Sequence, residues 1–554
     1  MELRKILLIA FVFSGIAALI YEITWIRPLQ FLLGSTIYTI SIIFAAFMLG
    51  LALGSWIISK RIEKIQNLPK TYALLEIGIG IYGILLLSIF NILPQVYNSL
   101  YSLHTNFYLF EIVQFLLVLL VLLIPTTLMG ATFPIIAKFY TKEKIGKGIG
   151  EVYAANNLGA IIGSFAAGFI LIPLIGIKGS IIFAGTINIL IASVILLKVD
   201  RNFSKKILPL LIIVFLILVF VGNYNIQQMH SGGFYRTHEG VAELGDVVYY
   251  EEGLHATVTV RELYNQGHTL FINGKSQGGN EINDLRVNYL LAYLPILINE
   301  NSENALVIGL GTGTTSGQLA QHRDVTTIEI EQAILKATDY FTIFNLNVLE
   351  NPYHHTIIDD ARNYLLKNNE KYDIVSQEPS DPWQSFSSAL YSQEFFELVK
   401  EDLNEEGLYV HWVPIYTMSV KDFRNFYKTF NSVFPNVVGF ANIKPNENTP
   451  VKFGTSEILL IGSQKEINLD KIDENYENLP IELKQYLDAL RLGSGEEISQ
   501  LLLFTDEQMQ GYAEDAKLIT DDKPILEFST AKNVLIQDPN VVIRDINNFL
   551  EDDE

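Results

Sequence analysis

Long apolar stretches dominate the first 222 residues and limit what this half of the chain can fold into. Each stretch is about as long as a bilayer crossing requires, and only short polar segments separate them. The stretches cover residues 6–26, 33–58, 71–93, 108–137, 151–175, 178–198 and 207–222. A cleaved signal peptide would explain the first of them but not the six that follow. The sequence therefore predicts a multi-pass helical membrane domain over residues 1–222.

The side of the membrane on which the rest of the chain lies depends on the number of crossings. Lys and Arg cluster in several of the short segments between the stretches, which is typical of cytoplasmic loops. With the N-terminus inside, seven crossings would place the remainder outside the cell. If the last stretch, with Pro209, does not cross, or if the fourth crosses twice around Pro125, the remainder returns to the cytoplasm. We expect a cell-membrane protein whose sidedness the charges leave open.

Two kinds of residue stand out within the apolar half. Polar groups at or near hydrocarbon depth either line a pathway or binding site or form structural pairs, and both readings stay open. They are Glu22, Arg27, Glu76, Glu111 and the pair Asn156–Asn157. Gly50 with Gly54, and Gly159 with Gly163, have the spacing that lets two helices approach closely, so we expect these glycines to serve packing.

Composition excludes several functions for the chain. The sequence has an acidic pI near 4.9 and no basic, aromatic-interleaved patch, so we expect no nucleic-acid partner. It contains no Cys, which excludes disulfides, thiol catalysis and Cys-based metal sites. The nine His show no metal-ligand spacing, so we predict no metal site.

The chain after residue 222 is predicted to be α/β. A small antiparallel sheet is expected at 246–274, with a turn at 265–267, and a helix at 283–298. Five apolar segments then alternate with helical ones, which is typical of a doubly wound, Rossmann-like sheet. These strands are expected at 304–310, 324–330, 355–359, 372–376 and 407–413. The predicted domains are 1–222, a sheet subdomain with its helix at 223–300, the Rossmann-like core at 301–465, and a C-terminal extension with an acidic tail at 466–554.

The carboxyl ends of the predicted strands carry glycines and acids, and ligands of such sheets bind at these ends. Glu329 ends the second strand about twenty residues after a Gly-rich turn, where an acid receives the two hydroxyls of a ribose. Any one acid here could instead be a helix N-cap, as Asp360 could be for the helix after it. As a set they predict one pocket, and its members are Gly309, Gly311, Gly313, Glu329, Asp359, Asp360, Glu378 and Asp381.

Several motifs, in order along nearly the whole chain, resemble the polyamine aminopropyltransferases, and in particular their membrane-fused, spermidine-synthase-like branch. They include "SGIAALIYEITWIRPL", "LFINGKSQGG", "ALVIGLGTGTT", "IEIE", "DDARNYL", "YDIVSQEPSDPW" and "ITDDKPILEF". The resemblance implies a small N-terminal β-sheet followed by a methyltransferase-type Rossmann core, a homo-oligomer and no metal. It also implies transfer of an aminopropyl group from decarboxylated S-adenosylmethionine to an amine, of the putrescine-to-spermidine type, with release of methylthioadenosine. Because S-adenosyl cofactors are cytoplasmic, this chemistry leads us to expect the soluble domain in the cytoplasm.

Site roles follow from the same resemblance. Glu378 stands where the family places its catalytic base, normally Asp, and would take a proton from the attacking ammonium. The amine side would be formed by Asp381, as an amine contact or loop organiser, with Tyr391 lining the amine channel and Trp383 closing the loop against water. The nucleoside would be held by Gln277, Glu329 and Asp360, with Glu329 on the ribose and Asp360 on the adenine amino group.

Three departures from the family pattern keep the substrate open. Thr312 replaces an Asp of the Gly-rich turn whose charge would repel the carboxylate of ordinary S-adenosylmethionine. Asn288 and Tyr289 replace a polyamine anchor, and the base is Glu rather than Asp. One alternative is therefore an S-adenosylmethionine-dependent methyltransferase, or another transferase, acting on a membrane-associated amine or lipid. A third reading is a transporter or sensor that binds a nucleoside or polyamine without turnover.

Overall fold

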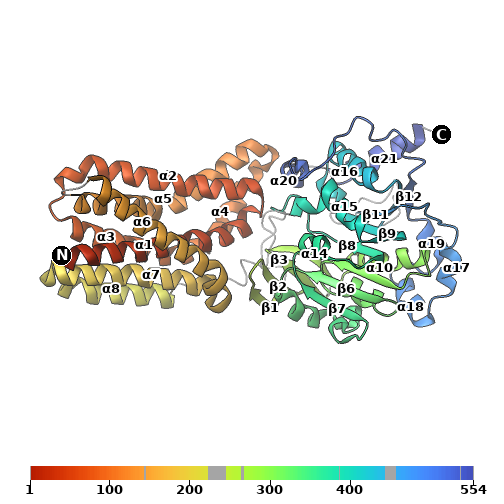
Figure 1. Cartoon of the computed structure of the whole chain (residues 1–554), viewed down its shortest axis with the longest axis horizontal. Coiled ribbons are helices and arrows are strands. Elements are labelled where there is room, and N and C mark those ends of the chain that lie inside the picture. Colours follow the sequence, from red (N-terminus) through yellow and green to blue (C-terminus); the bar gives the residue numbers. More distant parts are fainter. Residues whose placement is uncertain are drawn as a thin grey trace. The chain divides into compact units, whose positions relative to one another are not determined.

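The computed structural model describes residues 2–141, 145–221, 245–263, 267–385, 387–442, 457–536 and 538–552. It divides into two compact units, one helical and one α/β (Figure 1). The predicted turn at 265–267 falls largely outside the described residues.

The first unit is built from long apolar helices. Its α-helices are α1 (Glu2–Leu33), α2 (Ile37–Arg61), α3 (Leu68–Phe90), α4 (Leu93–Leu100), α5 (Phe107–Tyr140), α6 (Ile145–Ala166), α7 (Ile172–Val199) and α8 (Arg201–Val221). Within the described residues, six helical stretches are long and apolar enough to cross a membrane. The sequence predicted seven.

The difference in number arises at residues 145–199. There α6, a π-helical turn at Ala167–Leu171 and α7 form one helical stretch of 55 residues. A single crossing needs about 20 residues, so this stretch is long enough for two. Its backbone is broken at Gly176, which has a φ of 71°, a left-handed conformation that glycine adopts readily. The fifth and sixth predicted crossings therefore correspond to the two parts of this broken helix.

Glycines allow close helix contacts in this unit, as the sequence predicted. A β-carbon added to Gly159 in α6 would lie 2.0 Å from the carbonyl oxygen of Val12 in α1, and one on Gly163 would be similarly blocked by α1. Gly50 and Gly54 of α2 face α5 in the same way. The packing role of both glycine pairs is confirmed.

A Gly159→Ala substitution should lower the thermal stability of the protein. The added methyl meets backbone rather than a flexible side chain, and overpacking of this kind costs about 1–3 kcal/mol. Gly150→Ala in the same helix is the matched control, since no atom lies within 4 Å of its added β-carbon. Helix propensity predicts that the control is neutral or slightly more stable. Melting can be followed by the fluorescence of the four Trp of the chain, and equal melting temperatures for the two variants would contradict the prediction.

Glu76 of α3 makes hydrogen bonds to two other helices of the helical unit. Its carboxylate is buried and accepts hydrogen bonds of 2.6 Å from Ser14 Oγ and 2.6 Å from Asn188 Nδ2, which come from α1 and α7. These bonds join three helices and favour a structural role over a pathway at this position.

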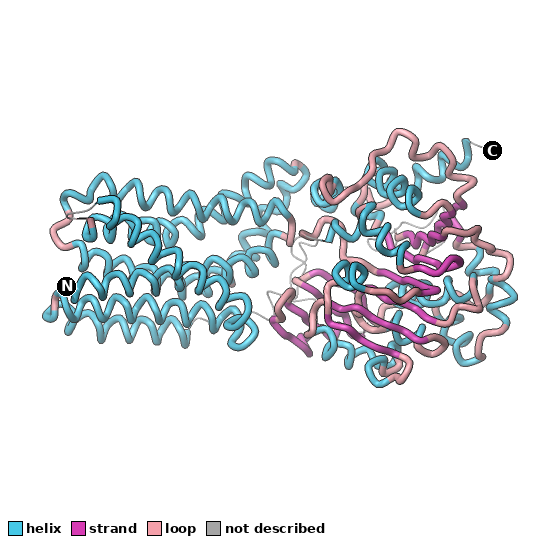
Figure 2. Tube along the Cα trace, in the orientation of Figure 1, coloured by secondary structure: helices cyan, strands magenta, loops and turns pink. Residues whose placement is uncertain are grey.

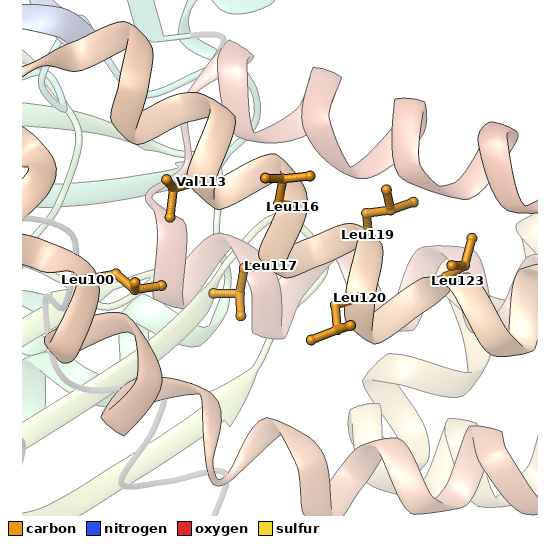
Figure 3. A pocket seen from close by; sticks show the side chains of 7 residues that line it. All are labelled: Leu100, Val113, Leu116, Leu117, Leu119, Leu120 and Leu123. Atoms are coloured by element: carbon orange, nitrogen blue, oxygen red, sulfur yellow. The ribbon is translucent and has the colours of Figure 1, made fainter.

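Leu and Val side chains line a surface recess of about 450 Å³ between α4 and α5 (Figure 3). Its lining residues are Leu100, Val113, Leu116, Leu117, Leu119, Leu120 and Leu123. A purely apolar wall offers no group for chemistry and is typical of helix surfaces that meet lipid chains.

The second unit begins with the predicted small antiparallel sheet. Its strands are β1 (Asp246–Glu252), β2 (Thr257–Leu263), β3 (Gly267–Ile272) and β4 (Lys275–Gly279), in the order β1-β2-β3-β4. β4 was not predicted, because "KSQGG" has neither apolar alternation nor β-branched residues. The helix α10 (Ile282–Ile298) follows, and it is buried from Leu285 onwards.

An eight-stranded sheet forms the centre of this unit (Figure 2). Its strands are β5 (Asn304–Ile308), β6 (Asp324–Glu329), β7 (His354–Ile358), β8 (Tyr372–Gln377), β9 (Leu403–Val413), β10 (Asn436–Ala441), β11 (Ile458–Ser463) and β12 (Leu502–Thr505). Their order is β12-β10-β11-β9-β8-β5-β6-β7. The five strands from β9 to β7 are parallel, while β10, β11 and β12 add antiparallel pairings. The predicted doubly wound sheet is confirmed.

The remaining α-helices of this unit lie between and after these strands in the chain. They are α11 (Thr314–Leu319), α12 (Ala333–Ala337), α13 (Thr342–Asn345), α14 (Ala361–Lys367), α15 (Gln393–Glu401), α16 (Val420–Val433), α17 (Ile472–Glu477), α18 (Ile481–Ala489), α19 (Gly495–Ser499), α20 (Ile525–Ile536) and α21 (Val541–Asp552). The strand order reverses at β5, which pairs with β6 on one side and with β8 on the other. Doubly wound sheets bind ligands at such a switch point.

Candidate active site

A cavity of about 360 Å³ lies at the carboxyl ends of β5, β6 and β8. Of the predicted site residues, its lining includes Gln277, Gly309, Gly311, Glu329, Asp359, Asp360 and Glu378. Gly313, Asp381, Trp383 and Tyr391 are not part of that lining. The fold thus brings most of the predicted set into one pocket, and the other four residues lie around it in supporting positions.

The Gly-rich turn after β5 brings bare backbone to the pocket. Gly309, Gly311 and Gly313 have φ values of 90°, 55° and 79°, which side chains rarely tolerate. Gly313 also precedes α11, and a β-carbon there would lie 2.8 Å from Val348. The first two glycines leave room for a ligand against the main chain, while the third allows the helix to pack.

Glu329 is fixed by the backbone on both sides of its carboxylate. The N–H of Leu310 donates to Oε2 at 2.9 Å, and the N–H of Glu331 donates to Oε1 at 2.8 Å. Each oxygen keeps a further lone pair, which suits a side chain that receives two hydroxyls. Burial raises the pKa of this carboxyl.

Glu331 also lines the pocket, and the sequence analysis did not select it. Its Oε2 accepts hydrogen bonds from the N–H groups of His255 and Ala256, at 2.8 and 2.9 Å. It therefore joins the small sheet to the Rossmann core at the edge of the pocket. The second acid of "IEIE" was the available signal, but its partners lie about 75 residues earlier in the chain.

Asp359 and Asp360 follow β7. Asp360 is the N-cap of α14, because its Oδ1 accepts a hydrogen bond from the N–H of Asn363 at 3.0 Å. Asp359 Oδ1 accepts from the N–H of Asp360 at 2.8 Å. Asp360 thus has the capping role left open by the sequence and lines the pocket as well.

Gln277 reaches the pocket from β4. Its Nε2 is buried and has no hydrogen-bond partner among the described residues. A buried donor without a partner costs free energy, so this amide is available to a ligand.

Glu378 lies directly after β8 on the pocket wall. Burial raises its pKa to about 8, the negative charge of Asp284 adds to the shift, and the ammonium of Lys275 opposes it. Asn288, one of the departures from the family pattern, donates a long hydrogen bond of 3.4 Å to Oε2 of Glu378. The raised pKa makes the deprotonated carboxylate of Glu378 a stronger base toward an ammonium group than an ordinary Glu, and the side chain releases its proton only as pH rises through about 8.

Asp381 is completely buried, and its partners are protein groups. Lys275 forms a salt bridge with Oδ2, and the hydroxyl of Tyr416 donates to Oδ1 at 2.9 Å. Tyr391 is also fully buried, and its hydroxyl donates to the carbonyl oxygen of Ser380 at 3.1 Å. Trp383 is 3% exposed within the same loop. These contacts hold the loop that carries Glu378.

Thr312 and Tyr289, which also differ from the family pattern, lie in different surroundings. Thr312 lines the pocket, and its hydroxyl is hydrogen-bonded to that of Thr314 at 2.9 Å. Tyr289 is buried beside the pocket and accepts a hydrogen bond from Gln318 Nε2 at 3.0 Å. Thr312 thus presents an uncharged group to the ligand, whereas Tyr289 serves the core.

The part of the chain that carries this pocket matches a known family model. Residues 285–447 match the family described as the spermine/spermidine synthase domain. The α/β unit therefore contains a region similar to the polyamine aminopropyltransferases. The matched segment begins within α10, extends past β10 and contains the Gly-rich turn, Glu329 and Glu378. This match and the relatives described next support a transferase.

Two polyamine aminopropyltransferases and a spermidine synthase structure match the chain at low sequence identity. Polyamine aminopropyltransferase 2 of Aquifex aeolicus is 23% identical over 420 residues, covering 74% of this chain and 79% of that protein. The polyamine aminopropyltransferase of Corynebacterium efficiens is 24% identical over 420 residues, covering 73% of this chain and 76% of that protein. Among solved structures, spermidine synthase from Thermotoga maritima aligns with a TM-score of 0.36 and 16% identity, over 55% of this chain and 88% of that one.

Proposed function

We propose that this protein transfers an aminopropyl group from decarboxylated S-adenosylmethionine to an amine at the membrane, with Glu378 as the catalytic base. The observation that carries the proposal is the position of Glu378, a carboxyl with a raised pKa on the wall of the pocket that also contains the Gly-rich turn and Glu329. The helical unit, with six stretches apolar enough to cross a bilayer, would keep the enzyme in the membrane.

The pocket residues fit the donor substrate. Glu329 has free lone pairs for two ribose hydroxyls, the bare backbone at Gly309 and Gly311 admits a flat ligand, and Asp359 and Asp360 add negative charge. Both reactants of aminopropyl transfer are cations, so an acidic pocket favours bringing them together.

The protein then has to accept one proton during the reaction. Glu378 accepts a proton from the ammonium of the acceptor, and the freed nitrogen lone pair attacks the methylene next to the sulfonium. The carbon–sulfur bond breaks, and its electron pair leaves with methylthioadenosine. Asn288 would hold the carboxylate through its bond to Oε2. A fixed, partly desolvated base suits this step, because it loses little solvation when it acts.

A methyltransferase is the second candidate, and Thr312 favours it. An uncharged group at this point of the pocket does not repel the carboxylate of ordinary S-adenosylmethionine. The two donors differ only in that carboxylate, so offering them separately distinguishes the two enzymes.

A product assay tests the proposal. Full-length protein in detergent is given a panel of mono-, di- and polyamines, with decarboxylated or ordinary S-adenosylmethionine in separate reactions. Methylthioadenosine that appears only with the decarboxylated donor and an amine supports aminopropyl transfer. S-adenosylhomocysteine from the ordinary donor would support the methyltransferase instead. Neither product, with nucleoside still bound, would indicate a binding protein.

The pH dependence of turnover should report the base. Glu378 acts only when deprotonated, and its pKa is about 8, so kcat at saturating substrates should rise as pH rises through about 8. Asp284→Asn removes a negative neighbour that raises this pKa, so its midpoint should move to lower pH. The check is a pair of pH profiles measured on the two proteins, and coincident midpoints would contradict the assigned coupling.

A further inference from the structure

The last helix of the helical unit, α8, is the apolar helix most exposed to its surroundings. Only 11% of its apolar stretch is buried, whereas the other five stretches long enough to cross a membrane are 33–56% buried in the described part of the chain. One face of α8 packs against α3 and α7, and Leu211 is buried there in a cluster with Ile77 and Ile191 (Figure 1). The opposite face is exposed from the first turn of the helix to the last.

The exposed residues of α8 form one stripe, because their spacing places them on the same side of the helix. We call this surface the α8 stripe, and its members are Arg201, Asn202, Lys205, Lys206, Pro209, Leu210, Ile212, Ile213, Leu216, Ile217 and Phe220. Leu210 is 53% exposed and Phe220 is 78% exposed. The stripe is thus basic and polar over its first two turns and purely apolar after them.

The basic residues of the stripe carry charges that the protein does not neutralise. Arg201, Lys205 and Lys206 are exposed and form no salt bridge with any described residue. The neighbouring acid, Asp200, is already bound to Nζ of Lys70 at 2.9 Å. Asp200 also caps α8, since its Oδ1 accepts a hydrogen bond from the N–H of Phe203 at 3.0 Å. Three positive charges therefore remain available at the start of α8.

A phospholipid carries the same two chemistries in the same order. Its phosphate is anionic and lies at the membrane surface, while its acyl chains fill the hydrocarbon layer. With 21 residues, α8 is about as long as a bilayer crossing requires, so its basic start belongs at the level of the headgroups. Lys and Arg near the ends of such helices reach to the interface and attract anionic lipids. The α8 stripe therefore matches a lipid with an anionic headgroup.

A second copy of the chain is the competing occupant of this face, and two observations disfavour it. Helix pairs in membranes are enriched in small residues at their contacts, whereas the apolar part of the stripe consists of Pro, Leu, Ile and Phe. In a two-fold pair of α8 helices oriented alike in the bilayer, Lys205 and Lys206 would face their own copies and repel them. A lipid has neither disadvantage.

We propose that α8 carries a binding site for an anionic phospholipid. Arg201, Lys205 and Lys206 hold the headgroup phosphate, and the apolar part of the α8 stripe contacts the acyl chains. This site lies outside the pocket of the proposed reaction and does not depend on it, so lipid binding can be measured without turnover.

A single fluorescent label on the stripe tests the proposal. The chain contains no Cys, so Leu210→Cys gives the full-length protein one thiol, about one turn after Lys206. The bimane-labelled protein is reconstituted in phosphatidylcholine vesicles that contain a low mole fraction of brominated phosphatidylglycerol or of brominated phosphatidylcholine. The ratio of quenching by the two brominated lipids gives their relative binding constant. It should favour phosphatidylglycerol by about tenfold or more, because each basic residue near a membrane surface contributes about fivefold.

Charge variants separate a site on α8 from a general attraction by the protein. Lys205→Gln/Lys206→Gln in the labelled protein should lower the preference for phosphatidylglycerol at least fivefold. Arg61→Gln/Lys64→Gln is the matched control, because it removes the same charge from exposed residues at the end of α2 and just after it. This control should keep the preference within twofold. An equal fall in both double variants, or a preference below twofold before any charge is removed, would overturn the proposal.

Two further arms exclude the other occupants. Inorganic phosphate has no acyl chains, so it should relieve the quenching no more than sodium chloride of equal ionic strength does. Greater relief by phosphate would mean a simple anion site and would overturn the lipid assignment. A label that neither brominated lipid quenches, together with cross-linking of Leu210→Cys by a bifunctional maleimide, would mean that a second copy covers the stripe and would also overturn it.

Discussion

Replacing Glu378 with Gln should lower kcat for aminopropyl transfer by about a thousandfold, within the range of about 10²–10⁴ that a positioned general base contributes. Gln has nearly the same shape as Glu but cannot accept a proton from an ammonium group. The pocket wall and the contact with Asn288 stay in place, so the KM values of both substrates should change much less than kcat. The measurement is methylthioadenosine release at saturating donor and amine, compared with the wild type.

Thermal melting distinguishes loss of the base from loss of the fold. The raised pKa of Glu378 means that the folded protein holds this proton more tightly than the unfolded chain does. Stability from this group is thus present at low pH and is lost as pH rises from the ordinary value of 4.5 through about 8. Glu378→Gln should therefore melt no lower than the wild type at alkaline pH. A variant that melts normally and keeps full activity would remove Glu378 from the mechanism.

The parts of the site that the sequence predicted depend on local signals. Apolar runs of strand length, each followed by a helical segment, place Gly309, Glu329, Asp359 and Glu378 at strand ends, and parallel strands bring those ends to one edge. The structure brings all four into one pocket. Local pattern is enough here because the doubly wound topology fixes which end of each strand meets the ligand.

The parts that the sequence missed depend on contacts between distant segments. Lys275 lies on a short strand without apolar alternation, and only the fold brings it to Asp381. Glu331 looked like a second acid after a strand until the small sheet supplied its partners. Asp381 itself was predicted to contact the amine or to organise its loop, and its two protein partners give the loop-organising interpretation a physical basis. Tertiary packing decides which acidic side chains line the pocket and which ones pair with other protein groups.

The number of membrane crossings in the helical unit was difficult to predict from the sequence for a related reason. Hydropathy locates apolar residues well, but α6 and α7 run together, and only the φ of Gly176 shows where the helix is broken. The glycine pairs were easier to predict, because their four-residue spacing places both members on one helix face. The backbones of α1 and α5 lie against those faces.

Replacing Glu329 with Ala should weaken nucleoside binding by about two orders of magnitude. The carboxylate would make charge-assisted hydrogen bonds to two hydroxyls, each worth about 1.5–3 kcal/mol, and about 1.4 kcal/mol corresponds to a factor of ten. Calorimetric titration with methylthioadenosine measures the change directly, without turnover. Asp324→Ala is the matched control, since Asp324 begins the same strand at its far end and is exposed.

Glu329→Ala also leaves the N–H groups of Leu310 and Glu331 without their acceptor, so the Gly-rich turn could lose its shape. Glu329→Gln separates the two effects. Its amide oxygen can still accept one of these N–H groups, but the side chain has lost the negative charge and one acceptor. If the ribose contact is the cause, Glu329→Gln should weaken binding by at least tenfold while the melting temperature falls less than in Glu329→Ala. Unchanged affinity in Glu329→Gln would mean that this carboxylate supports the turn and that the ribose binds elsewhere in the pocket.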